Sequence, residues 1–210
     1  MKIKLKKLTV ILLCFLLVLS VTSCSEVKQA QKSMEDMFAL LKDGKYDEAC
    51  AFHISTLGGD NDFLACRGKF NEKDFPAYEM HKELFSTLEY KVLETVSSST
   101  TKVTLRVEIT TVDLEPVGEN LLNVLTEYNY MADNSETPIT EEERTEFGLQ
   151  RLEEISQDYL SGSDRKNKTS VIDVNIYFEK GQTWKVYPDD TLVNVLTGGA
   201  YNKFDVTKAN

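Results

Sequence analysis

The chain has 210 residues, of which 41% are hydrophobic and 28% are charged, and its formal net charge is −10. This length and composition are typical of one globular domain. An acidic chain without a long stripe of Lys and Arg lacks the positive surface that nucleic-acid binding requires, so we expect no nucleic acid among its partners.

The first 23 residues have the layout of a secretory signal peptide. The segment MKIKLKK holds four lysines and is followed by LTVILLCFLLVL, twelve residues without a charge. This apolar run is shorter than the roughly 20 residues that a helix needs to cross a bilayer. We therefore interpret residues 1–23 as a removable export signal; the alternative is a retained anchor with a cytoplasmic tail.

The signal ends in a short motif, Val21-Thr22-Ser23-Cys24. It resembles the bacterial lipobox, and this implies that Cys24 receives a diacylglyceryl thioether and that a dedicated peptidase cuts before it. The alternative is a chance cysteine after an ordinary signal peptide. Because one acyl chain gives only marginal membrane binding, two chains would hold residues 24–210 stably at the extracytoplasmic face of the cell membrane.

Removal of the leader makes the remaining chain more acidic. Residues 1–23 contain four lysines and no acid, so cleavage leaves 20 basic and 34 acidic residues and a formal net charge of −14. We expect such a protein to stand away from an anionic membrane surface rather than lie flat on it.

The remaining cysteines form an even pair. Cys14 lies in the leader and Cys24 is the proposed lipidation site, which leaves Cys50 and Cys66. In an exported chain these two thiols can form a disulfide, and closing a loop of this size stabilises a fold by about 3 kcal/mol. The alternative is two buried free thiols that pack as small hydrophobic groups.

The first part of the exported chain predicts three helices. Residues 25–42 have helical periodicity, and Gly44 is placed to end that helix. A second short helix is expected near Asp47, with Ala49, Cys50 and His53 on one side, and a third over about residues 74–89. The apolar positions of the first helix are Val27, Ala30, Met34, Met37, Phe38 and Leu41.

The second part predicts four strands and three more helices. Strands are expected over residues 90–96 and 101–112, and a hairpin is expected over residues 170–186. Between them, Asp113 is expected to cap one helix, and Thr140 with Glu143 forms a capping-box pattern that opens another. A closing helix is expected after Asp190 as its cap, and Gly198 ends it. The pattern predicts one α+β domain over residues 24–210.

The order of these elements resembles the nuclear transport factor 2-like fold, a cone in which a curved antiparallel sheet wraps around three N-terminal helices. The phrases MFALLKDGKYDEACAF, LFSTLEYKVLETV, KVTLRVEITTVDL and GQTWKVYPDDTLVNVLTGG are also similar to uncharacterised surface lipoproteins of low-GC Gram-positive bacteria. Residues 113–160 depart from the common fold by inserting two helices, and four strands replace the usual six.

The resemblance implies an open mouth between sheet and helices, where a small apolar ligand would sit. The alternative is that the same residues form a simple core. The candidate lining residues are Phe38, Tyr78, Phe85, Val107, Ile176 and Trp184.

The sequence contains little that points to catalysis. His53 and His81 are its two histidines, and either could act as a base beside an acid such as Asp36. No metal-ligand spacing, phosphate-binding glycine loop or nucleophile motif is present, so we expect no metal and no cofactor. We expect a non-catalytic binding or accessory role, with an envelope protein or a small apolar ligand as partner; the alternative is an isomerase- or lyase-type enzyme that uses the cone.

Overall fold

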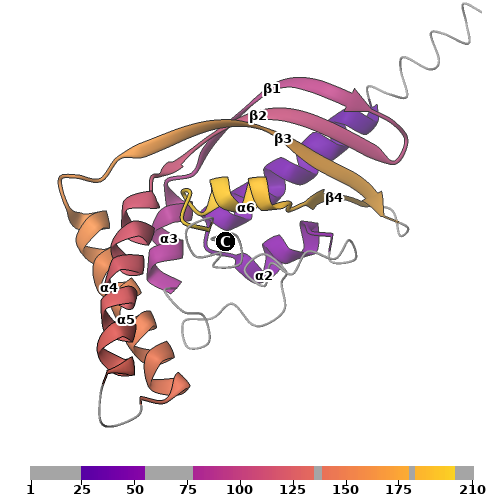
Figure 1. Cartoon of the computed structure of the whole chain (residues 1–210). Coiled ribbons are helices and arrows are strands. Elements are labelled where there is room, and N and C mark those ends of the chain that lie inside the picture. Colours follow the sequence, from indigo (N-terminus) through magenta and orange to yellow (C-terminus); the bar gives the residue numbers. More distant parts are fainter. Residues whose placement is uncertain (1–24, 55–77, 135–138, 180–182, 202–210) are drawn as a thin grey trace, which may run out of the picture.

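The structure is a computed structural model that describes residues 25–54, 78–134, 139–179 and 183–201. The leader, Cys24 and Cys66 lie outside these ranges, so the predictions made for them stay predictions. Figure 1 shows an α+β arrangement in which helices lie beneath a curved antiparallel sheet, which confirms the expected fold class. The elements are a first helix over residues 25–42, α2 (Tyr46–Ala49), a 3-10 turn η1 (Cys50–Phe52), α3 (Tyr78–Ser86), β1 (Glu89–Ser98), β2 (Lys102–Val112), α4 (Glu115–Asp133), α5 (Glu141–Ser161), β3 (Asn167–Glu179), β4 (Thr183–Tyr187) and α6 (Asp190–Leu196).

The sheet has the strand order β1-β2-β3-β4, with every neighbouring pair antiparallel. Its buried face follows from the period-two pattern of β2, because alternate side chains of a strand point to the same side. Leu105 pairs with Val174, and Val103 pairs with Ile176. These four side chains and Val107 are buried in the main apolar cluster, so the predicted one-sided strand is confirmed.

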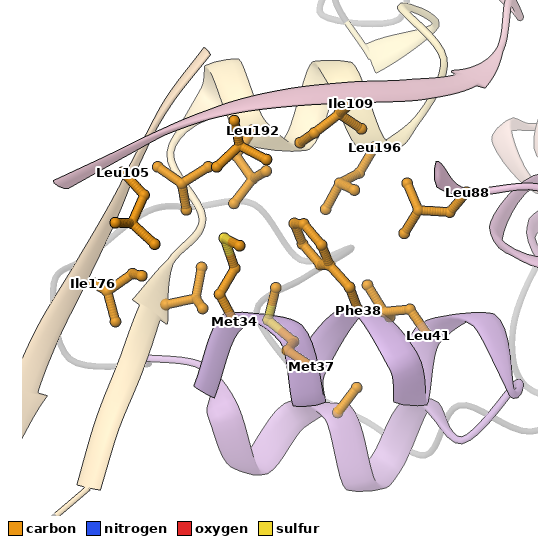
Figure 2. Close-up of a cluster of buried hydrophobic side chains, with 14 of the residues drawn as sticks. Met34, Met37, Phe38, Leu41, Leu88, Leu105, Ile109, Ile176, Leu192 and Leu196 are labelled. Carbon is orange, nitrogen blue, oxygen red and sulfur yellow. The ribbon is translucent and has the colours of Figure 1, made fainter. Parts of the chain in front are cut away.

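The first helix, residues 25–42, fills the concave side of the sheet. Met34, Met37, Phe38 and Leu41 are buried and lie on its sheet-facing side. Figure 2 shows them directed toward α6 and toward the side chains of β2 and β3. Each fully buried side chain of this size contributes about 1.5–3 kcal/mol through its removal from water. The helix is therefore an integral part of the core.

Helices α4 and α5 form an antiparallel pair at one end of the sheet (Figure 1). The ring of Tyr128 stacks on that of Phe147, with centroids 3.9 Å apart. Thr140 accepts a hydrogen bond from the backbone N–H of Glu143, whose carboxylate accepts one from the Thr140 N–H, and this confirms the predicted capping box. The base of the pair packs on α3 in a second apolar cluster that includes Leu84.

Two predicted helix starts need correction. The N-cap of α6 is Asp189, whose carboxylate accepts the Leu192 N–H at 2.9 Å, and Asp190 is the first helical residue. Leu114, and not Asp113, occupies the N-cap position of α4. The Asp113 carboxylate still accepts a hydrogen bond from the Glu115 N–H at 3.2 Å. Asp189 and Asp190 are equivalent in a sequence pattern, and only the backbone path decides which carboxylate reaches the end of α6.

Two other predictions were wrong near the first connections. His53 does not lie on a helix; its backbone is extended and it forms a parallel bridge with Val186 of β4. Helix α3 ends at Ser86 rather than near Glu89, because Glu89 already pairs with Thr110 in the sheet. In both places a long-range backbone pairing replaces the local helical pattern.

Gly198 allows α6 to end directly against the start of α4. Its φ is +62°, and its carbonyl accepts the N–H of Leu114 at 2.8 Å. A Cβ at this position would lie 2.2 Å from the carbonyl oxygen of Val112. Gly44, which ends the first helix, has a similar φ of +70° but has no atom within 4 Å of its would-be Cβ.

These two glycines give a matched test of the close approach. We expect Gly44→Ala to cost about 1–2 kcal/mol, the strain of an L-residue in the left-handed region. Gly198→Ala carries the same strain and also a clash with backbone, so its loss of unfolding free energy in urea should be clearly larger. Equal losses for the two variants would show that α6 does not end against β2 and α4 as described.

Candidate functional site

The candidate cavity residues whose side chains the structure describes are packed in the core. Phe38, Phe85 and Trp184 belong to the main apolar cluster. The Phe38 ring meets Tyr90 edge-on with centroids 5.1 Å apart. The side chain of Tyr78 lies outside the described part of the structure. These contacts give each described ring a packing role, and a ligand cavity lined by them stays a prediction.

His53 is the most unusual polar group of the interior. Only 7% of the residue is exposed, and neither ring nitrogen has a hydrogen-bond partner among the described residues. The backbone around it is fixed, because the Ile54 N–H donates to the Val186 carbonyl at 3.1 Å. Burial, together with the nearby charge of Lys185, lowers the pKa of His53 to about 4. The imidazole is therefore neutral at pH 7, and a buried polar group without a partner costs about 1–3 kcal/mol.

The sequence offered Asp36 as one possible acid beside a histidine, but Asp36 pairs with Lys32 instead. The Asp36 carboxylate accepts a hydrogen bond from Lys32 at 2.8 Å on the surface of the first helix. His81 is buried on α3, with its ring 6.3 Å from that of Phe85. The His53 ring has no hydrogen-bond partner among the described residues, so His53 is not paired with Asp36.

Cys50 begins η1 and is disulfide-bonded. The proposed second cysteine, Cys66, lies outside the described residues, so the Cys50–Cys66 pairing itself stays a prediction. His53 follows Cys50 by one 3-10 turn, and its N–H donates to the Cys50 carbonyl at 3.2 Å. The disulfide and the 3-10 turn together restrain the backbone where it pairs with β4 through His53.

The outer face of the sheet carries paired charges and polar contacts. The Arg106 guanidinium bonds Asp173 of β3 at 2.9 Å and Glu94 of β1 at 2.5 Å, which ties three strands together. The hydrogen bond to Asp173 raises the pKa of Arg106. Next to this network, Thr104 donates to Asn175 at 3.0 Å. These polar side chains pair with one another across the strands, as expected for a surface in contact with water.

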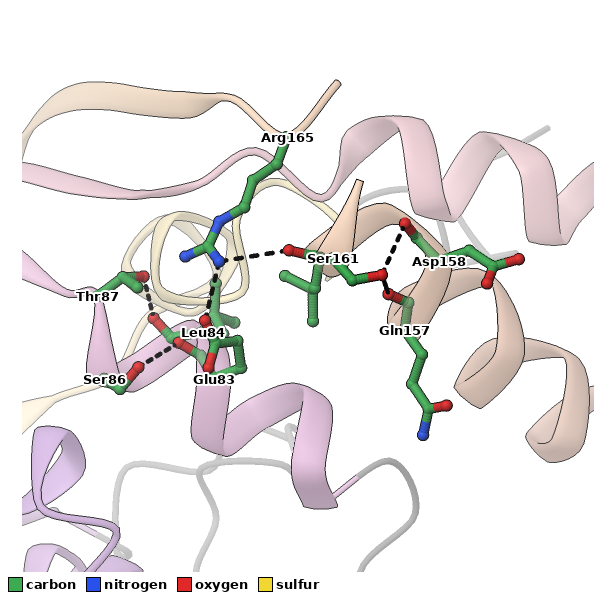
Figure 3. Close-up of polar contacts among 9 residues, drawn as sticks. Glu83, Leu84, Ser86, Thr87, Gln157, Asp158, Ser161 and Arg165 are labelled. Carbon is green, nitrogen blue, oxygen red and sulfur yellow. Dashed lines mark hydrogen bonds and ion pairs between the residues drawn. The ribbon is translucent and has the colours of Figure 1, made fainter. Parts of the chain in front are cut away.

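Ion pairs also tie the base of the α4–α5 pair to the rest of the domain. Figure 3 shows Arg165, between α5 and β3, reaching Glu83 of α3 at 2.8 Å. Lys168 of β3 donates to Glu115 of α4 at 2.6 Å. The two-helix insertion is therefore fixed at its base by charge pairs in addition to apolar contacts.

Neither the proximity of His53 to Lys185 nor the Arg106 network could be predicted from the sequence. Both depend on strand register and on a bridge between residues far apart in the chain. The alternation of polar residues along β2 does indicate that Arg106 faces water, but it does not identify its partners.

Within the described ranges, no group of three or more His, Cys, Asp or Glu residues is arranged to hold a metal ion. The helices of the same ranges include none with the length and apolar character needed to cross a membrane.

Comparison with known proteins yields one structural similarity. No protein-family model matches the chain, and no curated protein matches it in sequence. The crystal structure of a putative lipoprotein from Bacillus subtilis is similar over 60% of this chain, with 15% sequence identity and a TM-score of 0.34. The chain spans 38% of the length of that protein.

The buried imidazole predicts a specific pH dependence of stability. The pKa of His53 is about 4 in the folded protein and near 6.5 in an unfolded chain, so the unfolded state binds more protons between these values. Stability is therefore lost as the pH falls from 6.5 to 4, by about 3 kcal/mol in total for this residue. His53→Leu removes the titrating group while keeping an apolar filling of similar size.

Urea unfolding of the wild type and His53→Leu at pH 7 and pH 4 measures this effect, because the carboxylates common to both proteins cancel in the difference. We expect the stability of His53→Leu relative to the wild type to rise by about 3 kcal/mol at the lower pH. A difference that does not change with pH would mean that His53 is solvated or paired in the folded protein.

Proposed function

We propose that the protein is a lipoprotein held at the extracytoplasmic face of the cell membrane by a diacylglyceryl group on Cys24, and that it acts there by binding rather than by catalysis. The motif Val21-Thr22-Ser23-Cys24 after a basic and apolar leader carries this proposal. The position of the folded domain supports it, because residue 25, directly after the proposed cleavage and attachment point, already lies in a helix of the domain.

The non-catalytic role is supported by the state of the interior. A base needs an available lone pair and a pKa near the working pH. The buried His53 has a pKa of about 4 and no carboxylate partner among the described residues, and Asp36 is paired with Lys32 on the surface. The alternative, an isomerase- or lyase-type enzyme, would have to place its acid and base elsewhere.

The fold is proposed to be a variant of the nuclear transport factor 2-like cone. Support comes from the helices beneath the concave side of a curved antiparallel sheet (Figure 1). The four strands and the α4–α5 insertion distinguish it from the usual six-stranded form. The partner is proposed to be an envelope protein or a small apolar ligand, with no nucleic acid, metal or cofactor involved.

The anchor is tested by metabolic labelling with radioactive palmitate in the cells that produce the protein. We expect Cys24→Ser to abolish the label, since the thiol that would carry the lipid is removed. Cys14→Ser is the matched control, because Cys14 lies in the leader and is discarded on cleavage. Label that persists on Cys24→Ser, or that is lost from Cys14→Ser alone, would contradict the proposed attachment.

A further inference from the structure

We propose that the domain meets the lipid surface end-on, through the β1–β2 turn and the exposed ring of Phe178, with the α4–α5 pair directed away from the membrane. This inference rests on the proposed anchor at Cys24 and adds the surface by which the anchored domain contacts lipid. The orientation follows from the position of the first helix, which comes directly after Cys24.

The tether is too short to let the domain turn freely. Consecutive Cα atoms are about 3.8 Å apart, so Ser25 lies within that distance of the lipidated residue. Residue 25 is already helical, Val27 packs against the main core and Ala30 is fully buried. The first turn of the helix is thus attached to the domain on one side and to the lipid on the other. The end of the domain that surrounds this turn must lie at the bilayer surface.

A ring contact and two hydrogen bonds identify which end of the domain surrounds the first turn of the helix. The helix contacts Tyr90, at the start of β1, through Phe38 and the β4 backbone through Ser33, whose hydroxyl donates to the Trp184 carbonyl. Trp184 pairs with Phe178, and the Phe178 N–H donates to the Thr101 carbonyl in the β1–β2 turn at 2.9 Å.

Going toward its N-terminus, the helix therefore runs from the start of β1 toward the β1–β2 turn. Figure 1 agrees, since the helix begins beside the end of the sheet that carries this turn. The β1–β2 turn and the paired ends of β3 and β4 thus share the membrane-facing end with the first turn of the helix.

The chemistry of this end suits a shallow contact with lipid headgroups. Phe178 is 40% exposed although its ring rests on Trp184 at 5.4 Å, and Val96 of β1 is 42% exposed. Exposed Phe side chains of surface-binding segments insert at the boundary between headgroups and acyl chains. Lys28 on the first helix is exposed, and Lys102 lies over the Tyr177 ring at 5.3 Å, so both can approach anionic lipid.

The far end of the α4–α5 pair has side chains that are more exposed than Phe178 and Val96, and yet it is directed away from the membrane. Tyr130 and Met131, near the end of α4, are 72% and 63% exposed. Figure 1 shows this end of the α4–α5 pair far from the start of the first helix. The first turn of α5 carries Glu141, Glu142 and Glu143, which an anionic membrane repels. If exposed apolar area alone decided lipid contact, this end would bind lipid more strongly than the β1–β2 end.

A photoactivatable phospholipid tests the orientation. The full-length gene is expressed, the protein is purified from the membrane fraction, and it is reconstituted in vesicles that contain a lipid with a diazirine in its headgroup. After illumination, cross-linked peptides are identified by mass spectrometry. We expect peptides that contain residues 96–102 or Phe178 to carry several-fold more label than peptides that contain Tyr130 and Met131.

A spacer variant provides the control. An insert of about twelve Gly and Ser residues between Cys24 and Ser25 gives the tether a reach of roughly 19 Å. We expect it to lower the label at residues 96–102 several-fold while the protein stays bound to the vesicles. Unchanged label with the spacer would mean that the end binds lipid by itself and that the short tether is not what orients the domain.

Preferential label at Tyr130 and Met131, or a lipidated protein without label at the β1–β2 end, would overturn the orientation alone. The intact mass of the same preparation reports on the anchor separately. A mass without the diacylglyceryl group would overturn the proposed attachment, and the orientation with it.

Discussion

The burial of one face of the first helix beneath the sheet is the contact on which the rest of the domain depends. Met34, Phe38 and Leu41 meet side chains of β2 and of α6, so elements from both ends of the chain share one core. Truncation of a buried ring such as Phe38 to Ala costs about 3–5 kcal/mol, a large part of the stability of an ordinary domain. The helix that follows the proposed lipid attachment point therefore also supplies a large part of the core beneath the sheet.

The proposed anchor would therefore hold the domain without a flexible linker. Many tethered domains are separated from their lipid by a flexible linker, whose length sets how far the domain can move. Here residue 25 already lies in the first helix, and Ala30 is fully buried. A lipid on Cys24 would fix one end of the domain near the bilayer and leave the outer face of the sheet and the α4–α5 pair open to the space outside the cell. The acidic character of the chain after cleavage agrees with a domain that stands on the surface rather than lying along it.

Local patterns predicted the elements well, and long-range pairing accounts for what they missed. The periodicity of residues 25–42, the alternation along β2 and the Thr140–Glu143 capping box were all confirmed. His53 was placed on a helix because its neighbours have helical character, whereas its backbone in fact joins β4. For the candidate site, the sequence left Phe38 and Trp184 either lining a ligand mouth or forming a simple core, and both pack in one apolar cluster. The Lys32–Asp36 pair joins residues four apart on one helix, so it is a local contact that the sequence pattern contains. The Arg106 network and the bridge between His53 and β4 depend on how elements meet in space, and no local pattern contains that information.

The first helix belongs to the cooperative core, and with a lipid on Cys24 it would hold the domain directly at the proposed point of attachment. Native-state hydrogen exchange of backbone amides tests this claim, because it measures the free energy of opening at each residue. We expect the amides of residues 34–41 to exchange only through global unfolding, with the same opening free energy as Leu105 and Val107 of β2, while those of Tyr130 and Met131 open at lower cost. Opening of residues 34–41 well below the global value would contradict the claim, since the helix would then detach from the sheet while the rest of the domain stayed folded.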